Sequence, residues 1–242
     1  MRGWLTPHPD DAFDATCQDL CGGYQQASAR AQQGERTVSL AEMTGIQARE
    51  RAAPTLPLQP GPVERQEFEY IRQGTQALIA GFEVATGQVL GGVGETRTEA
   101  DCAQFLKTLG ATDPTCPKWH LVMDTLNTQV SESVVRWVAE QRAVTEALGV
   151  KGKSGILQSM ASREAFLRED SHNIVFHFTP TQASWRNQLE IWFAILVRKV
   201  IRRGNCLSRE DLRHKIEAFI DYFNRTMAKP FRWTYQGKPL TA

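Results

Sequence analysis

The stretch WHLVMD, residues 119–124, is a short apolar run that ends in an acid. Its length and composition predict a buried strand, and a polar loop follows it at residues 125–129. Helical patterns lie on both sides, at residues 98–110 and 131–149. Strands that alternate with helices are typical of a parallel sheet. Asp124 would then lie at the carboxyl end of a strand, where open α/β sheets present their active sites.

The rest of the chain supplies the other elements of such a sheet. Strands are expected at residues 36–45 and 173–180, with at least two β-type runs and a Thr-Gly turn within 67–97. Helices are expected at residues 10–31, 162–169, 184–203 and 208–226, and residues 51–66 form a proline-rich loop. Early hairpins followed by strand–helix alternation predict an α/β protein with a mixed five-stranded sheet flanked by helices. This is the pattern of the ribonuclease-H-like fold.

Composition is ordinary for a globular protein. The chain has 242 residues, of which 41% are hydrophobic and 23% charged, and its net charge is +1. Bulk charge therefore does not indicate a nucleic-acid binder, although basic residues gather between residues 186 and 213. No apolar run predicts a membrane span or a secretory signal, and the five cysteines are scattered and odd in number. We expect a cytoplasmic protein with reduced thiols and no membrane partner.

One carboxylate stands out in the expected helix at residues 184–203. Its apolar stripe consists of Trp185, Leu189, Trp192, Phe193, Leu196 and Val200. Glu190 lies beside this stripe, where a solvated or salt-bridged acid would be the ordinary interpretation. In the expected fold, however, the helix after the last strand meets the sheet edge that carries Asp124. Two adjacent carboxylates repel each other, and Mg²⁺ or a similar oxygen-seeking cation relieves that repulsion. Two such ions can promote in-line phosphoryl transfer.

Several collinear segments then make a resemblance specific. They are VSLAEMTGIQA at 38–48, EFEYIRQGTQALIAGFEVATG at 67–87, HLVMDTLNT at 120–128, HFTPTQASWRNQLEIWF at 177–193 and KPFRWTYQGKPL at 229–240. Together they resemble the catalytic core of bacterial insertion-sequence transposases related to mariner elements, from about residue 5 to residue 242. This resemblance implies a DDE-type enzyme, in which two aspartates and a third acid hold Mg²⁺ or Mn²⁺. Such enzymes cut DNA at transposon ends and join it to target DNA, so the implied partners are DNA and a second transposase chain, as a homodimer or with full-length transposase.

The resemblance assigns the acids by position. Asp124 matches the second acid and Glu190 the third, both as metal ligands, but Ala41 occupies the position of the first. Glu42 is a poor substitute, because successive side chains on a strand point to opposite faces. Two further departures are Thr125, where asparagine is usual, and Gln129, where histidine is usual. Loss of a metal-binding acid commonly costs several powers of ten in rate, so we expect impaired catalysis.

The resemblance also suggests a division of the chain and several origins for it. We expect a helical lead-in at 1–35, a ribonuclease-H-like catalytic core at 36–205, and a C-terminal helix with a basic-aromatic tail at 206–242. About 35 residues precede the first strand, too few for two helix-turn-helix modules. The chain could thus be a fragment, an engineered form or a decayed copy. Three other functional interpretations remain open: a non-catalytic DNA-binding or dimerising regulator, a nuclease that recruits Glu42, and a chain without selected function.

Basic and polar residues near the expected site are candidates for DNA contacts. They are Arg72, Arg186, Asn187, Arg198, Lys199, Arg202 and Arg203. Arg186 and Asn187 could instead orient Glu190, and the run at 197–205 also fits a solvated helix end, where cations are favoured. Trp185 fits the helix core. We interpret His172 and His177 as structural, because no metal-ligand spacing surrounds them.

Overall fold

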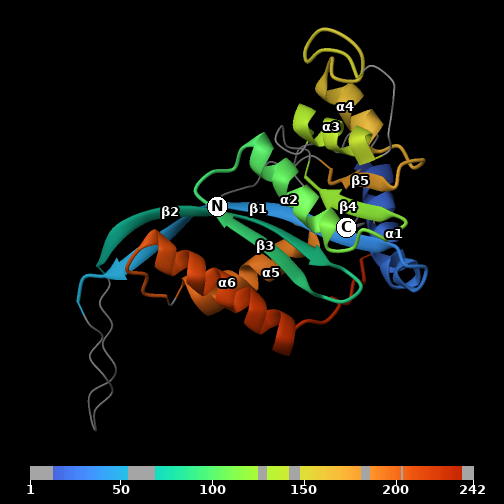
Figure 1. The fold of residues 1–242 in the computed structure, drawn as a ribbon. Helices are drawn as coiled ribbons and strands as arrows, with labels where there is room; N and C mark the ends of the chain where they lie inside the picture. The colour runs from blue at the N-terminus through green and yellow to red at the C-terminus, as the bar shows by residue number, and fades with distance from the viewer. Residues whose placement is uncertain are drawn as a thin grey trace, which may run out of the picture.

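A mixed five-stranded sheet forms the centre of the molecule (Figure 1). The computed structural model describes residues 13–53, 69–124, 130–141, 148–180, 186–202 and 204–235. The strands are β1 (Arg36–Arg51), β2 (Tyr70–Glu83), β3 (Val89–Gly94), β4 (Trp119–Met123) and β5 (Ile174–Phe178), in the spatial order β3-β2-β1-β4-β5. The first three pair antiparallel, whereas β4 runs parallel to β1 and to β5. The predicted ribonuclease-H-like fold is confirmed.

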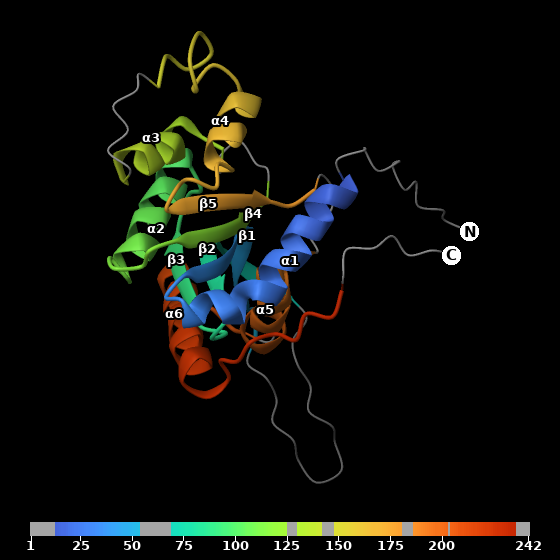
Figure 2. The same ribbon diagram turned by 90° about the vertical axis from the view of Figure 1, so that its right-hand side faces the viewer.

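Helices cover both faces of this sheet (Figure 2). They are α1 (Phe13–Gln32), α2 (Glu99–Ala111), α3 (Glu132–Gln141), α4 (Met160–Leu167), α5 (Gln188–Leu196) and α6 (Arg209–Thr226). A π-helical turn, η2 (Val197–Ile201), continues α5. Helices α2, α3 and α4 lie on one face, and α5 and α6 lie on the other, where α1 packs against β1 and β5. No described helix is long and apolar enough to cross a membrane.

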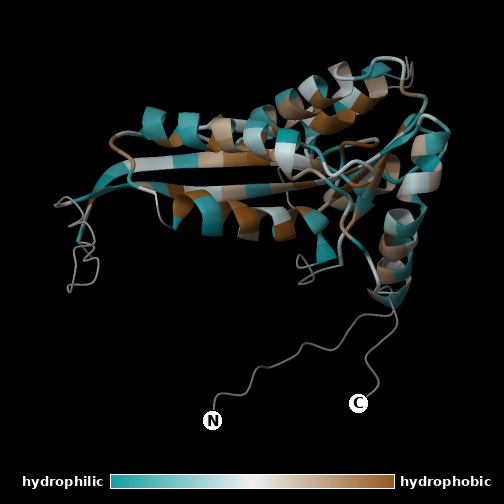
Figure 3. Ribbon diagram, turned by 90° about the horizontal axis from the view of Figure 1, so that it is seen from below, coloured by the Kyte–Doolittle hydropathy of each residue, from teal (hydrophilic) through white to brown (hydrophobic). Residues whose placement is uncertain are grey.

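Strand alternation divides the hydrophobic core into two layers, and hydrophobic residues gather where the helices meet the sheet (Figure 3). On β1, Val38 and Leu40 belong to the layer under α2 and α3, whereas Ala41 belongs to the layer under α5 and α6. On β4, Leu121 and Val122 divide in the same way. Consequently, Ala41 and Val122 face the side of the sheet that α5 and α6 cover.

Some boundaries differ from the sequence-based expectation. Strand β1 continues six residues beyond the predicted end at Gly45, because it pairs with β2 as far as Arg51↔Tyr70. Gly45 lies in a register shift with a φ of +65°, so the glycine marks an irregularity instead of an end. The expected helix at 131–149 is described only as far as Gln141, and residues 142–147 lie outside the described part of the chain. Beyond Leu196 the expected α-helix becomes the π-helical η2.

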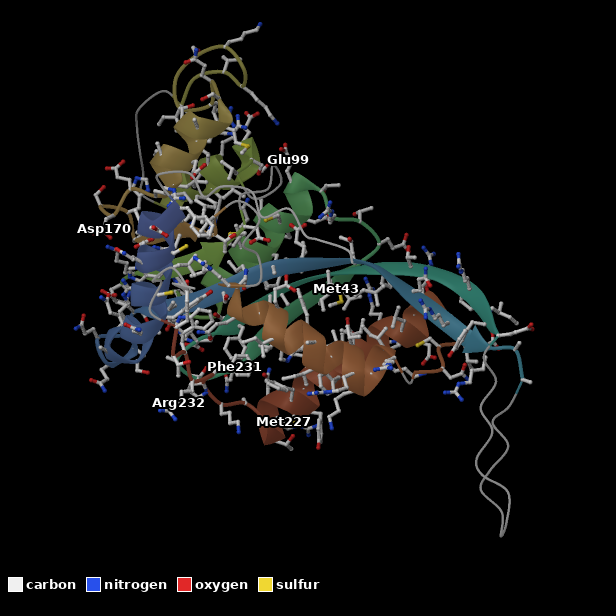
Figure 4. All side chains as sticks on the ribbon, turned by 180° about the vertical axis from the view of Figure 1, so that it is seen from behind. Met43, Glu99, Asp170, Met227, Phe231 and Arg232 are labelled. Atoms are coloured by element: carbon white, nitrogen blue, oxygen red, sulfur yellow. The ribbon has the colours of Figure 1, made fainter. Side chains whose placement is uncertain are left out.

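The segment after α6, residues 227–235, is irregular, as predicted, and packs against the layer under α5 and α6; we call it the C-terminal strap. Phe231 stacks on Phe82 of β2, with ring centroids 4.5 Å apart, and Trp233 lies 4.8 Å from Tyr24 of α1. In Figure 4, Met227 and Phe231 lie on the α5–α6 side of the sheet, and Glu99 marks the opposite side. The strap thus joins the end of the chain to its first described helix.

Candidate active site

Asp124 lies directly after β4, at the carboxyl end of the strand, and is half-buried. The hydroxyl of Thr179, a buried residue just after β5, donates a hydrogen bond of 2.5 Å to its Oδ1. The backbone N–H of Thr179 also donates to the carbonyl of Met123, at 2.8 Å. These two bonds tie the ends of the neighbouring parallel strands together, so they fix the orientation of the Asp124 carboxylate.

Glu190 lies in the first turn of α5 and is also half-buried. Burial raises the pKa of its carboxyl group, and the negative charge of Asp124 raises this pKa further. Each effect disfavours the charged form. The structure therefore brings the two acids into one electrostatic environment, although 66 residues separate them in the sequence.

Ala41 lies on the same sheet face as these acids and is 4% exposed. It packs in the hydrophobic layer that includes Val122 of β4 and Leu189 of α5. Val122 lies two positions before Asp124, and Leu189 lies directly before Glu190. A methyl group there offers no ligand to a cation. The position expected for the first acid is thus apolar and buried.

Glu42 points to the opposite face, as strand alternation predicts. It forms an ion pair of 3.3 Å with Arg97, and its side chain is only 3% exposed. Burial raises the pKa of Cys102 in α2 to about 12, and the charge of Glu42 contributes to that increase. Glu42 therefore faces the α2 layer, across the sheet from Glu190.

Arg186 and Asn187 lie at the start of α5 and are 4% and 1% exposed. The Arg186 guanidinium lies between the rings of Phe13 and Tyr235, at 4.8 Å and 5.1 Å from their centroids. The Asn187 side chain caps α5 by accepting from the N–H of Leu189. The polar groups of Arg186 and Asn187 thus face protein, and a DNA contact by either residue stays a prediction.

The other basic candidates that the structure describes are exposed. Arg72 lies on β2 in the long β1–β2 hairpin, Arg198 and Lys199 lie in η2, and Arg202 follows η2. The candidates and departures at Thr125, Gln129, Trp185 and Arg203 lie outside the described residues.

Sequence reasoning missed Arg49, which lies opposite Arg72 in the β1–β2 register and is exposed. Its guanidinium is 5.8 Å from the centroid of the Tyr70 ring. Its carbonyl accepts from the N–H of Cys206 at 2.8 Å, so the chain that follows η2 reaches the hairpin. The signal for Arg49 was its place in a strand that continues past Gly45.

Two histidines on the Asp124 face form a hydrogen-bonded chain with two acids, which we call the histidine relay. His177 of β5 lies 2.9 Å from Asp19 of α1 and 3.1 Å from His120 of β4, which lies 3.2 Å from Glu35. His172 is buried beneath Phe166, with ring centroids 4.6 Å apart. The contact between His177 and Asp19 joins α1 to β5.

The donor set can be compared with what a hard divalent cation requires. Carboxylate oxygens suit Mg²⁺ and Mn²⁺. The pKa of Glu190 is raised first by burial and then by the negative charge of Asp124, and a cation would relieve the second effect. Among the described residues, however, no three His, Cys, Asp or Glu side chains are grouped to hold a metal ion. Asp124 and Glu190 therefore offer carboxylates of the kind that such a cation binds, and Ala41 offers no ligand.

Comparisons with known proteins complete these findings. The sequence model of one family, described as DDE superfamily endonuclease, matches residues 38–213. No curated protein matches the chain. Similar solved structures include the Mos1 mariner paired-end complex with Mn, at 17% identity and a TM-score of 0.38 over 96% of this chain and 68% of that one. They also include the catalytic domain of Mos1 mariner transposase, at 12% identity and a TM-score of 0.35 over 95% and 100% of the two chains.

Proposed function

Because the chain belongs to the DDE superfamily endonucleases, we propose that it is a transposase catalytic domain whose DNA cleavage and strand transfer are impaired. One observation supports the proposed impairment of catalysis. Ala41 lies buried at the place where the first acid is expected, on the sheet face that α5, the helix of Glu190, covers. The rest of the site supports a transposase ancestry, because the other two acids and the fold that positions them are present.

The described residues have separate parts in this proposal. Thr179 holds the Asp124 carboxylate by its hydrogen bond, and the first turn of α5 presents Glu190 beside it. Bound Mg²⁺ or Mn²⁺ would supply charge stabilisation at the phosphate and lower the pKa of bound water. Asp124 and Glu190 would hold that ion more weakly than three acids would. Solved structures of the Mos1 mariner paired-end complex contain Mn or Mg, and this supports the choice of these two ions.

DNA is the proposed partner. The exposed cations Arg72, Arg198, Lys199 and Arg202 lie on the hairpin and on the continuation of α5, and we add Arg49 to them. Such cations attract phosphates regardless of base sequence. The Mos1 paired-end complex contains the left transposon end, which supports transposon ends as the natural substrate. An origin in a bacterial insertion sequence, and a homodimer or a pairing with full-length transposase, belong to the same proposal.

Nicking of supercoiled plasmid DNA in Mg²⁺ or Mn²⁺ tests the proposal. We expect no nicking above background by the natural chain, nicking by Ala41→Asp, and loss of that nicking in Ala41→Asp combined with Glu190→Gln. Restoring one metal-binding acid should raise the rate by several powers of ten. Efficient cutting by the natural chain would contradict the assigned impairment. If that cutting disappeared in Glu42→Gln, Glu42 would be the recruited acid, despite its ion pair with Arg97.

The second candidate is a non-catalytic regulator that binds DNA or pairs with an active transposase. The same buried Ala41 favours it, because the fold and the exposed cations persist while one acid is missing. DNA binding and self-association in the absence of nicking by both the natural chain and Ala41→Asp would favour this function over the first.

A further inference from the structure

The start of α5 is held by a buried group of hydrogen-bonding side chains from three separate elements. They are Tyr24 of α1, Ser39 of β1 and Asn187 before α5, which are 4%, 0% and 1% exposed. The Tyr24 hydroxyl is 3.1 Å from Ser39 Oγ, and Ser39 Oγ donates to Asn187 Oδ1 at 2.6 Å. We call these three residues the α5 anchor.

The anchor satisfies the amide groups that every helix leaves unpaired at its start. The N–H of Gln188 donates to Ser39 Oγ at 3.1 Å and to the Tyr24 hydroxyl at 3.3 Å. The N–H of Leu189 donates to Asn187 Oδ1 at 3.0 Å, and the N–H of Glu190 donates to the Asn187 carbonyl at 3.1 Å. The first three amides of α5 are therefore fixed, including that of the site acid.

The anchor also fixes α5 relative to β1. Asn187 Nδ2 donates to the carbonyl of Leu40 at 2.6 Å, one residue before Ala41. The Tyr24 hydroxyl lies 3.2 Å from the carbonyl of Arg186 and can donate to it. One connected network thus reaches the residue before the expected first-acid position and the residue that carries the third acid.

Charge and burial set the chemistry of this network. Burial raises the pKa of Tyr24, and the negative charge of Asp124 adds to that effect. The phenol therefore stays neutral, and it interacts electrostatically with Asp124. Buried polar groups with full sets of partners hold one geometry firmly, whereas a lost partner leaves the others unsatisfied. Small displacements of a ligand by its supporting residues are enough to weaken a metal site.

We propose that Tyr24, Ser39 and Asn187 are positioning residues, which set the distance and orientation of Glu190 relative to position 41 and so make α1 part of the active site. This inference rests on the proposed function for its consequence, metal binding, but its geometric content can be measured without it. The anchor acts through the backbone of α5 and contacts no substrate.

The test compares Tyr24→Phe and Asn187→Ala with Asn224→Ala, each in the Ala41→Asp protein. Asn224 is a matched control, because its side chain also forms two bonds to backbone, with the N–H and the carbonyl of Val89 at 2.8 Å, on the edge strand β3. Mn²⁺ affinity is measured by titration calorimetry, amide exchange of residues 188–190 by NMR, and stability by urea unfolding.

We expect Asn187→Ala to weaken Mn²⁺ binding about tenfold or more, and Tyr24→Phe to weaken it less, because it keeps the ring against Trp233. In both variants amide exchange should accelerate at residues 188–190. Asn224→Ala should lower stability and leave Mn²⁺ affinity unchanged.

Two results would overturn the inference: equal losses of Mn²⁺ affinity in Asn187→Ala and Asn224→Ala, or unchanged exchange at residues 188–190 in both anchor variants. Absence of Mn²⁺ binding in Ala41→Asp itself would instead refute the proposed metal site. The exchange measurement would then decide the anchor alone, since it needs no metal.

Discussion

At the scale of single residues, the absence of a side chain at Gly87 lets the C-terminal strap approach the β2–β3 turn closely. Gly87 has a φ of +78°, and a Cβ at this position would overlap the backbone of Lys229. Gly152 has a similar φ, +74°, but no atom lies within 4 Å of its Cβ position. Both glycines thus have a positive φ, but only Gly87 has another segment, the backbone of Lys229, at its Cβ position.

Gly87→Ala should therefore destabilise the protein more than Gly152→Ala, by about 1–3 kcal/mol of unfolding free energy. Both variants include the cost of a side chain at positive φ, so the difference isolates the contact with the strap. Urea unfolding of the two variants measures it. Equal costs would mean that the strap moves away from the turn without loss.

At the scale of elements, the histidine relay attaches α1 to β4 and β5. Burial lowers the pKa of His120 to about 4, and the positive charges of Arg30 and His177 act in the same direction against the opposing pull of Glu35. The hydrogen bond from His177 lowers the pKa of Asp19. His120 is thus held neutral in the folded protein, whereas its ordinary pKa is 6.5.

The sign of the pH dependence follows from these directions. Between pH 6.5 and about 4 the unfolded chain binds a proton at His120 that the folded chain does not, so stability should fall as the pH falls through this window. The part due to Asp19 should be lost only at lower pH, below its ordinary value of 3.8. Unfolding of His120→Gln across this range should show a flatter dependence.

His214→Gln is the control for that measurement, because the His214 side chain is 78% exposed. Its stability should follow pH as the natural chain does. A His120→Gln protein with an unchanged slope would show that other groups cause the loss at acidic pH.

At the scale of the whole molecule, charge distribution matters more than total charge. A net charge of +1 gives little general attraction to DNA, so binding must depend on where the cations lie. Arg198 and Lys199 are both exposed in η2, on the continuation of the helix that carries Glu190. Lys153 is equally exposed, but it lies in the segment before α4, on the other side of the sheet.

Replacing Arg198 and Lys199 together by alanine should weaken binding of duplex DNA and reduce the slope of log affinity against log salt by about 2. Fluorescence anisotropy across a salt series measures both quantities. Lys153→Ala should change neither. An unchanged slope in the double variant would place the DNA-binding surface elsewhere.

Much of the fold was accessible from local pattern. Apolar runs and helical patterns predicted the order of strands and helices, and a capping box of Thr98 and Asp101 begins α2 at the start of the expected helix at 98–110. The same patterns placed Asp124 at a strand end, Glu190 in a helix and Glu42 on the face opposite Ala41. Such features are short-range, because a few neighbouring residues fix whether a side chain points up or down.

The supports of the site were not accessible in this way. Thr179 reaches Asp124 across 55 residues, and Tyr24 meets Ser39 and Arg186 across 15 and 162. The sequence predicts Arg186 as a candidate for DNA contact, whereas in the structure its guanidinium lies over the rings of Phe13 and Tyr235. By itself the sequence determined the order of the elements and identified Asp124 and Glu190 as candidate acids, with Ala41 at the position expected for the first. Only the tertiary structure decided which distant side chains hold them, since such contacts exist only after the sheet and its helices have packed.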